Sequence, residues 1–135
     1  MSESEREYYT WERFDADVKK IADWARNRGF KNIYGIPRGG LIVGVALSHL
    51  LDLPLVLSRD DITRQTLIVD DIVETGGTVE HLKMYLGFRT GVASLYDMHG
   101  ARVQPDFCVN HKIKWIVFPW ETDKTSKYDN NIKAS

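Results

Sequence analysis

The chain has 135 residues, of which 43% are hydrophobic and 27% are charged, and its formal net charge is -1. This length suits one ordinary domain, and the composition allows a buried core and a soluble surface. A nonspecific nucleic-acid binder would usually be basic, so we expect no nucleic-acid partner. A small anionic ligand held at one local site is compatible with this charge.

The chain has one cysteine, Cys108, so it can form no internal disulfide, which fits a reducing compartment. We expect Cys108 to be a buried apolar residue rather than a nucleophile. The polar N-terminus does not resemble a signal peptide, and no apolar run has the length of a membrane span. These features predict a cytoplasmic protein with no membrane partner. We expect one domain over residues 1–135, with polar, loosely ordered ends at 1–9 and 122–135.

The first predicted element is a helix that begins at Thr10, a suitable capping residue, and ends near Gly29. A short strand at 32–36 follows, then a "PRGG" turn and an apolar helix. The next strand is predicted at 53–57.

An uninterrupted apolar strand is predicted at 66–70, as expected at the centre of a parallel sheet. It precedes a helix that Gly87 ends and a strand at 91–96, and "FCV" and "WIVF" are two late strand candidates. This alternation predicts an α/β fold, a three-layer Rossmann-like, mainly parallel sheet flanked by helices. Ligands of such sheets bind beyond the carboxyl ends of the strands.

The stretch "LIVDDIVETGGT", residues 67–78, places two adjacent acids at such a carboxyl end. Asp70 and Asp71 repel each other, and a sugar diol or a magnesium ion would supply the hydroxyl donors or the positive charge that they need. The Thr-Gly-Gly-Thr turn then opens a helix, whose free backbone N–H groups suit a phosphate. Together the segment predicts a ribose-phosphate site. A plain strand-turn-helix with a glycine-rich cap is the alternative for the turn alone.

The same stretch resembles the phosphoribosyl-pyrophosphate motif of the type I phosphoribosyltransferases. "YGIPRGGLIVG", residues 34–44, is similar to the pyrophosphate loop of that family. "WIVFPWE", residues 115–121, resembles the C-terminal segment of its xanthine/guanine/hypoxanthine members, where an aromatic residue covers the base. "YYTWERFDADVKKIADW" resembles their opening helix, so the resemblance covers most of residues 8–121.

The resemblance implies the type I phosphoribosyltransferase fold, with a short C-terminal hood. It also implies an enzyme that moves the ribose-5-phosphate of phosphoribosyl pyrophosphate to a purine-like base, with Mg2+ as cofactor and release of pyrophosphate. A homodimer is expected, because the family often dimerises. Two alternatives stay open: a non-catalytic module of the same fold that binds a nucleotide or phosphoribosyl pyrophosphate, and a transferase with a non-purine acceptor.

The resemblance also implies roles for individual residues. Asp70 and Asp71 would contact the ribose diol directly or through metal-bound water, and Glu74 would be the proton acceptor facing the purine. An acid at this position favours 6-oxopurines, although Glu74 is one methylene longer than the usual aspartate. The remaining assignments are to the 5'-phosphate (Thr75, Gly76, Gly77, Thr78), the diphosphate (Arg38, Gly39, Gly40) and the base (Trp115, Ile116, His99).

Two regions depart from the family pattern. The link "SRDDITRQ" leaves almost no room for the flexible loop that usually closes over the site, so the loop is truncated. Arg59 and Arg64 in this link either meet the diphosphate or are solvated surface residues. Met98 and His99 occupy the positions of a Lys-Pro pair whose lysine recognises the 6-oxo group, and His99 or Arg102 could replace that donor.

The late aromatic residues Trp115, Phe118 and Trp120 fit either a base-stacking wall or a small C-terminal core. The histidines have no ligand-like spacing with Cys108 or with each other, so the sequence predicts no zinc site.

Overall fold

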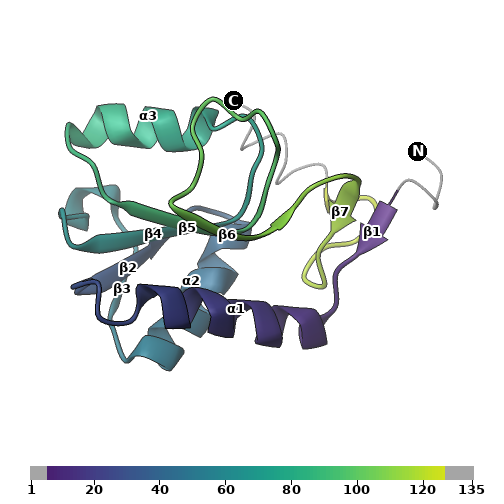
Figure 1. Cartoon of the computed structure of the whole chain (residues 1–135), viewed down its shortest axis with the longest axis horizontal. Helices are drawn as coiled ribbons and strands as arrows, with labels where there is room; N and C mark the ends of the chain where they lie inside the picture. The colour runs from purple at the N-terminus through teal and green to yellow at the C-terminus, as the bar shows by residue number, and fades with distance from the viewer. Residues whose placement is uncertain (1–5, 127–135) are drawn as a thin grey trace.

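The computed structural model describes residues 6–126, which form a five-stranded parallel sheet and a separate pair of parallel strands (Figure 1). The order of the main sheet is β3-β2-β4-β5-β6. The elements are β1 (Arg6–Tyr8), α1 (Trp11–Ala25), β2 (Asn32–Gly35), α2 (Gly39–Leu51), β3 (Leu55–Val56), the 3-10 turn η2 (Arg59–Asp61), β4 (Thr66–Val73), α3 (Gly77–Leu86), β5 (Gly91–Asp97), β6 (Phe107–His111) and β7 (Trp115–Val117).

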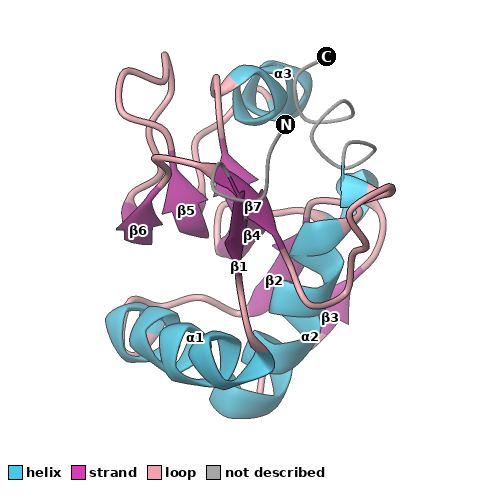
Figure 2. Ribbon diagram, turned by 90° about the vertical axis from the view of Figure 1, so that its right-hand side faces the viewer, coloured by secondary structure: helices cyan, strands magenta, loops and turns pink. Residues whose placement is uncertain are grey.

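The predicted three-layer architecture is confirmed. Helices α1 and α2 cover one face of the main sheet and α3 covers the other (Figure 2). Leu67 and Val69 of β4 belong to the core beneath α1 and α2, whereas Ile68 belongs to the core beneath α3. The central strand is therefore apolar on both faces, which explains its uninterrupted apolar sequence.

The predicted strands and most predicted helix ends agree with the structure. Thr10 caps α1 by accepting a hydrogen bond from the Arg13 backbone N–H at 3.1 Å, and Gly87 ends α3 with φ of 74°. The predicted end of the first helix is wrong, because α1 stops at Ala25 and Gly29 lies in the following loop. Asn27 already takes a positive φ there, so the chain leaves the helix before it reaches the glycine.

Some of the residues expected to be loosely ordered are paired in the structure. β1 pairs with β7, and Tyr9 is buried against Tyr96 and Phe118, so residues 6–9 are anchored by the C-terminal segment. Residues 122–126 form a turn held by hydrogen bonds between Thr122 and Thr125. Residues 1–5 and 127–135 lie outside the described part of the chain.

No helix within residues 6–126 combines the length and the apolar character that a membrane crossing requires.

Candidate functional site

The two aspartates of β4 both lie near the start of α2, and Asp70 also lines the hollow beside the glycine-rich turn. Asp70 and Asp71 are 1% and 0% exposed, and the Asp71 backbone N–H donates to the Asp70 carboxylate at 2.9 Å. Asp71 lies beneath the start of α2, where a Cβ added to Gly39 would be 1.9 Å from the Asp71 carboxylate. Asp70 instead lines a hollow together with Glu74, Gly76 and Thr78. The two acids are therefore placed differently at the carboxyl end of β4: Asp71 lies beneath Gly39, whereas Asp70 lies near Gly40 and borders the hollow.

Glycines bring the start of α2 against β4. A Cβ on Gly40 would lie 2.7 Å from the Val69 carbonyl oxygen, and one on Gly39 would overlap Asp71, so neither position accepts a side chain. The N-terminus of α2 carries a partial positive charge that stabilises the nearby Asp71 carboxylate. The residues assigned to the diphosphate, Arg38, Gly39 and Gly40, therefore lie beside the carboxyl end of β4.

The Thr-Gly-Gly-Thr turn is shaped by contacts within the turn and by a second loop. Gly76 has φ of 86°, and a Cβ there would be 2.5 Å from the Val103 backbone nitrogen. Thr75 accepts a hydrogen bond from the Gly77 N–H at 3.0 Å through its hydroxyl, and one from the Arg102 N–H at 2.9 Å through its carbonyl. The loop between β5 and β6 thus lies against the turn and fixes its backbone.

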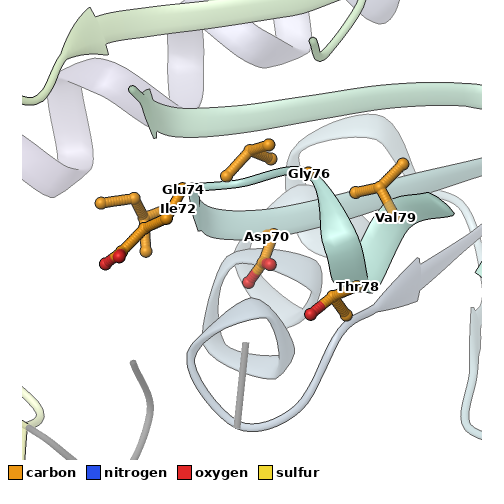
Figure 3. Close-up of a pocket in the computed structure, with 7 residues that line it drawn as sticks. Asp70, Ile72, Glu74, Gly76, Thr78 and Val79 are labelled. Atoms are coloured by element: carbon orange, nitrogen blue, oxygen red, sulfur yellow. The ribbon is translucent and has the colours of Figure 1, made fainter. Parts of the chain in front are cut away.

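Figure 3 shows how the side chains around this turn are oriented. Asp70 and Thr78 extend on the same side of the turn, whereas Glu74 extends away from them at the end of β4. A second hollow of about 440 Å3 begins at Glu74 and Thr75 and continues along Met98, His99 and Arg102. Glu74 therefore borders both spaces.

Lys112 is a site residue that sequence reasoning missed. Its ammonium donates to the Glu74 carboxylate at 3.0 Å, and the side chains of Lys112 and Glu74 are only 12% and 17% exposed. The ammonium also lies 5.2 Å from the centre of the Trp115 ring. The available signal was weak: the predicted strand "FCV" ends at Val109, and only the observed β6, which ends at His111, places Lys112 at the carboxyl edge of the sheet, where ligands bind.

The candidate donors His99 and Arg102 have different surroundings. Both border the second hollow, but the Arg102 guanidinium forms an exposed ion pair with Glu80 of α3 at 3.4 Å. It also lies 3.7 Å from the place that a Cβ of Gly77 would occupy. Arg102 is therefore beside the phosphate turn rather than beside Glu74.

The late aromatic residues were expected to form either a base-stacking wall or a small C-terminal core, and the structure divides them between these two interpretations. Phe118 and Trp120 stack on each other with ring centres 4.9 Å apart, and both contact residues of the N-terminal core, so they form the small C-terminal core. The Ile116 side chain is also buried in that core. Trp115 is half-buried, and its indole N–H donates to the Ser126 hydroxyl at 3.0 Å, which leaves its ring beside Lys112.

The short link between β3 and β4 is held against the sheet by Ile62, which is buried in the core beneath α3. Arg59 lies over the Tyr85 ring at 4.3 Å and lines a hollow of about 230 Å3 with Pro37 and Thr78. Arg64 lies over the Phe88 ring at 5.0 Å and lines a different hollow, near the amino ends of the strands. Of the two arginines, Arg59 is the one between the loops assigned to phosphate groups.

A buried polar network connects the pair of strands β1 and β7 to the main sheet. The Tyr96 phenol of β5 donates to the Glu7 carboxylate of β1 at 2.5 Å and accepts from Arg13 of α1 at 2.9 Å. Burial and the hydrogen bond to Glu7 raise the pKa of Tyr96. Although burial opposes the shift, hydrogen bonds from Tyr96 and Arg13 lower the pKa of Glu7 below 4.5.

Comparisons with known proteins agree with this geometry, although no protein-family model matches the chain. A purine phosphoribosyltransferase from Pyrococcus horikoshii is 33% identical, with a TM-score of 0.77 over 87% of this chain and 95% of that one. A xanthine-guanine phosphoribosyltransferase from Nitratidesulfovibrio vulgaris is 28% identical, and the match covers 84% of this chain and 83% of the relative.

A third protein extends the similarity of fold to nearly the whole chain. The Helicobacter pylori xanthine-guanine-hypoxanthine phosphoribosyltransferase superposes with a TM-score of 0.76, over 96% of this chain and 99% of that one, at 22% identity. That identity supports the fold alone, whereas the Pyrococcus protein supports common descent. The chain therefore belongs to the type I phosphoribosyltransferase family and is related to its xanthine-guanine members.

Proposed function

We propose that this protein is an enzyme that transfers the ribose-5-phosphate of phosphoribosyl pyrophosphate to a purine-like base and releases pyrophosphate. The observation that carries this proposal is the meeting of three kinds of group at the carboxyl end of β4. Asp70 lines one hollow with the phosphate turn, and Glu74 borders that hollow while it pairs with Lys112. Acid, anion cradle and base-recognition groups are thus adjacent.

The proposed phosphate contacts come from two loops. Residues 75–78 would hold the 5'-phosphate at the N-terminus of α3, where the partial positive charge of the helix favours an anion. Arg102, beside Gly77, adds a positive charge next to this turn. Arg38, Gly39 and Gly40 would hold the diphosphate, and Arg59 borders the hollow between Pro37 and Thr78.

Asp70 and Asp71 are the proposed carboxylates for the ribose hydroxyls and for Mg2+, directly or through water. Carboxylate oxygens are the ligands that this hard cation prefers, and Asp70 lines the hollow beside the turn, so the donor set fits the ion. When bound, Mg2+ would neutralise charge on the diphosphate. Asp70 would stabilise the positive charge that develops on the ribose as the bond to the diphosphate breaks.

The proposed base site lies around Glu74, Lys112, Trp115 and His99. Glu74 would accept a proton from the base, and the ammonium of Lys112 would donate to an oxygen on the same edge. A carboxylate and an ammonium 3.0 Å apart match a ligand edge that presents one donor and one acceptor, which favours 6-oxopurines. Trp115 would supply an aromatic face.

The test is pyrophosphate release from phosphoribosyl pyrophosphate and Mg2+ in the presence of guanine, xanthine, hypoxanthine or adenine, with the nucleotide identified by chromatography. We expect turnover with 6-oxopurines and little with adenine. Tight binding of phosphoribosyl pyrophosphate without nucleotide formation would instead support the non-catalytic module, which the short link between β3 and β4 favours. A homodimer and a cytoplasmic location stay predictions from the sequence.

A further inference from the structure

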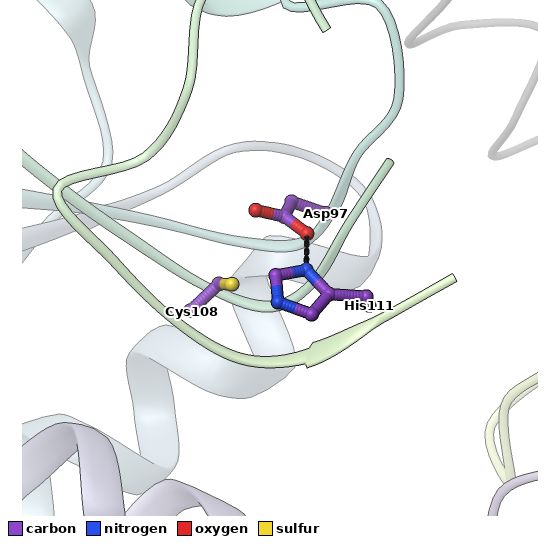
Figure 4. Close-up of side chains that lie close together, drawn as sticks. All are labelled: Asp97, Cys108 and His111. Atoms are coloured by element: carbon purple, nitrogen blue, oxygen red, sulfur yellow. Dashed lines mark hydrogen bonds and ion pairs between the residues drawn. The ribbon is translucent and has the colours of Figure 1, made fainter. Parts of the chain in front are cut away.

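Three metal-ligating side chains meet on the neighbouring strands β5 and β6, outside the phosphate and base sites. They are Asp97, Cys108 and His111, and their ligand atoms all lie within 4.8 Å of one another (Figure 4). Asp97 and His111 are direct partners in the parallel pairing of the two strands. The sequence predicted no zinc site from the spacing of Cys108 and the histidines, but the pairing of β5 with β6 brings Asp97 to Cys108 and His111.

The three side chains differ in how much of each is exposed to solvent. The Asp97 side chain is 7% exposed and lies 2.5 Å from the Nδ1 atom of His111, whose side chain is 72% exposed. Cys108 is half-buried, and its Sγ atom lies within 4.8 Å of the ligand atoms of Asp97 and His111. A buried carboxylate therefore holds the imidazole beside the thiol, and the imidazole side of the cluster faces solvent.

We propose that Asp97, Cys108 and His111 form a binding site for a divalent transition-metal ion, with zinc as the preferred ion. Sulfur, nitrogen and carboxylate oxygen are the ligands that zinc takes in proteins, and three protein ligands leave a fourth tetrahedral position for water. Magnesium disfavours thiolate and imidazole, so this site is chemically distinct from the magnesium site proposed at Asp70 and Asp71.

The geometry needs only a small adjustment. Zinc lies about 2.0 to 2.3 Å from its ligand atoms, so tetrahedral ligand atoms are roughly 3.5 Å apart. The exposed His111 ring can move away from Asp97 to admit the ion, while the buried carboxylate stays in place. Burial, followed by the neighbouring Asp97 carboxylate, raises the pKa of Cys108 to about 12, so metal binding must displace the thiol proton into solvent.

A metal here would join β6, the edge strand, to β5. The backbone N–H of Lys112, the residue after His111, already donates to the Asp97 carbonyl at 2.7 Å. The metal would therefore strengthen an existing link between β5 and the end of β6. Because the ion would bind the folded chain, its addition should raise the melting temperature. This inference concerns a separate ligand set and does not depend on the proposed transfer reaction.

The test titrates cobalt(II), a spectroscopic substitute for zinc, into protein freed of metal by a chelator that is then removed. The parent should bind one ion per chain with a thiolate-to-cobalt charge-transfer band, and zinc should abolish the band while excess magnesium should not. Cys108→Ser should lose the band, and His111→Ala should weaken binding about tenfold or more. His49→Ala, an exposed histidine of α2, is the matched control and should bind like the parent.

Because His111 is exposed, its replacement leaves the fold intact, which metal-free thermal unfolding would verify. Absence of the charge-transfer band in the parent would overturn the proposal. Equal cobalt affinity in the parent and the His111→Ala protein would also overturn it, since the cluster would then not be the site.

Discussion

The phosphate side and the base side of this site are assembled in different ways. On the phosphate side, Asp70 and residues 75–78 come from one continuous strand-turn-helix segment. On the base side, Glu74 follows β4, Lys112 follows β6 and Trp115 opens β7. A contiguous site can be recognised from a short motif, whereas a dispersed one depends on the order and register of strands.

The largest expected effect concerns the two aspartates, because only Asp70 lines the hollow. We expect Asp70→Asn to lower turnover by about 100- to 1,000-fold, since a charge aimed at the developing ribosyl cation is removed. Steady-state kinetics with saturating phosphoribosyl pyrophosphate would measure this.

Asp71→Asn is the matched comparison. Because Asp71 lies beneath Gly39, we expect its replacement to lower the melting temperature of the ligand-free protein more than Asp70→Asn does. If the two variants lost stability and turnover equally, the division of roles between Asp70 and Asp71 would be wrong.

The next effect concerns the glycines of the phosphate turn. We expect Gly77→Val to weaken phosphoribosyl-pyrophosphate binding by about 100-fold, because the valine side chain would occupy the anion's space. This factor corresponds to the loss of one or two charge-assisted hydrogen bonds. A Cβ at Gly77 would lie 3.2 Å from the Thr75 hydroxyl and 3.7 Å from the Arg102 guanidinium, both ends of side chains, so the fold should survive. Calorimetric titration would measure the binding.

Gly76→Ala provides the contrast within the same turn. Its φ of 86° and the 2.5 Å approach to Val103 should make the variant unstable by about 1 to 3 kcal/mol. Chemical denaturation would measure this. A stable Gly76→Ala protein would show that the loop between β5 and β6 does not fix the turn.

The third effect tests the dispersed base side. We expect Lys112→Met to raise the KM for the base by about tenfold, because a charged hydrogen-bond donor is lost, while the affinity for phosphoribosyl pyrophosphate stays the same. Lys31→Met, an exposed lysine before β2, should leave both constants unchanged. If Lys112→Met changed only the affinity for phosphoribosyl pyrophosphate, the assignment of Lys112 to the base side would be wrong.

The smallest effect concerns the network that joins β1 to β5. Its hydrogen bonds lower the pKa of Glu7, so the charged Glu7 stabilises the fold above pH 4.5, and this contribution is lost as pH falls through the lowered pKa. Glu7→Gln should therefore reduce the free energy of unfolding by about 1 kcal/mol at pH 7 and by less in acid. Urea denaturation at pH 7 and pH 3.5 would show whether the difference narrows.

The sequence determined the parts of this protein that depend on local chemistry. The apolar run at 66–70 fixed β4 as a central strand, Thr10 and Gly87 fixed two helix ends, and residues 67–78 indicated the phosphate turn and the acids. Each of these is a contiguous pattern whose periodicity, capping or glycine content has a direct backbone consequence.

The tertiary structure alone decided which distant side chains meet. The approach of α2 placed Asp71 beneath Gly39 and left Asp70 at the border of the hollow, although they are neighbours in sequence. The register of β5 with β6 brought Asp97 to His111, and the path after β6 brought Lys112 to Glu74. Such contacts follow from strand order and register. Sequences with the same local patterns could adopt other strand orders or registers, so no single stretch of this chain encodes these contacts.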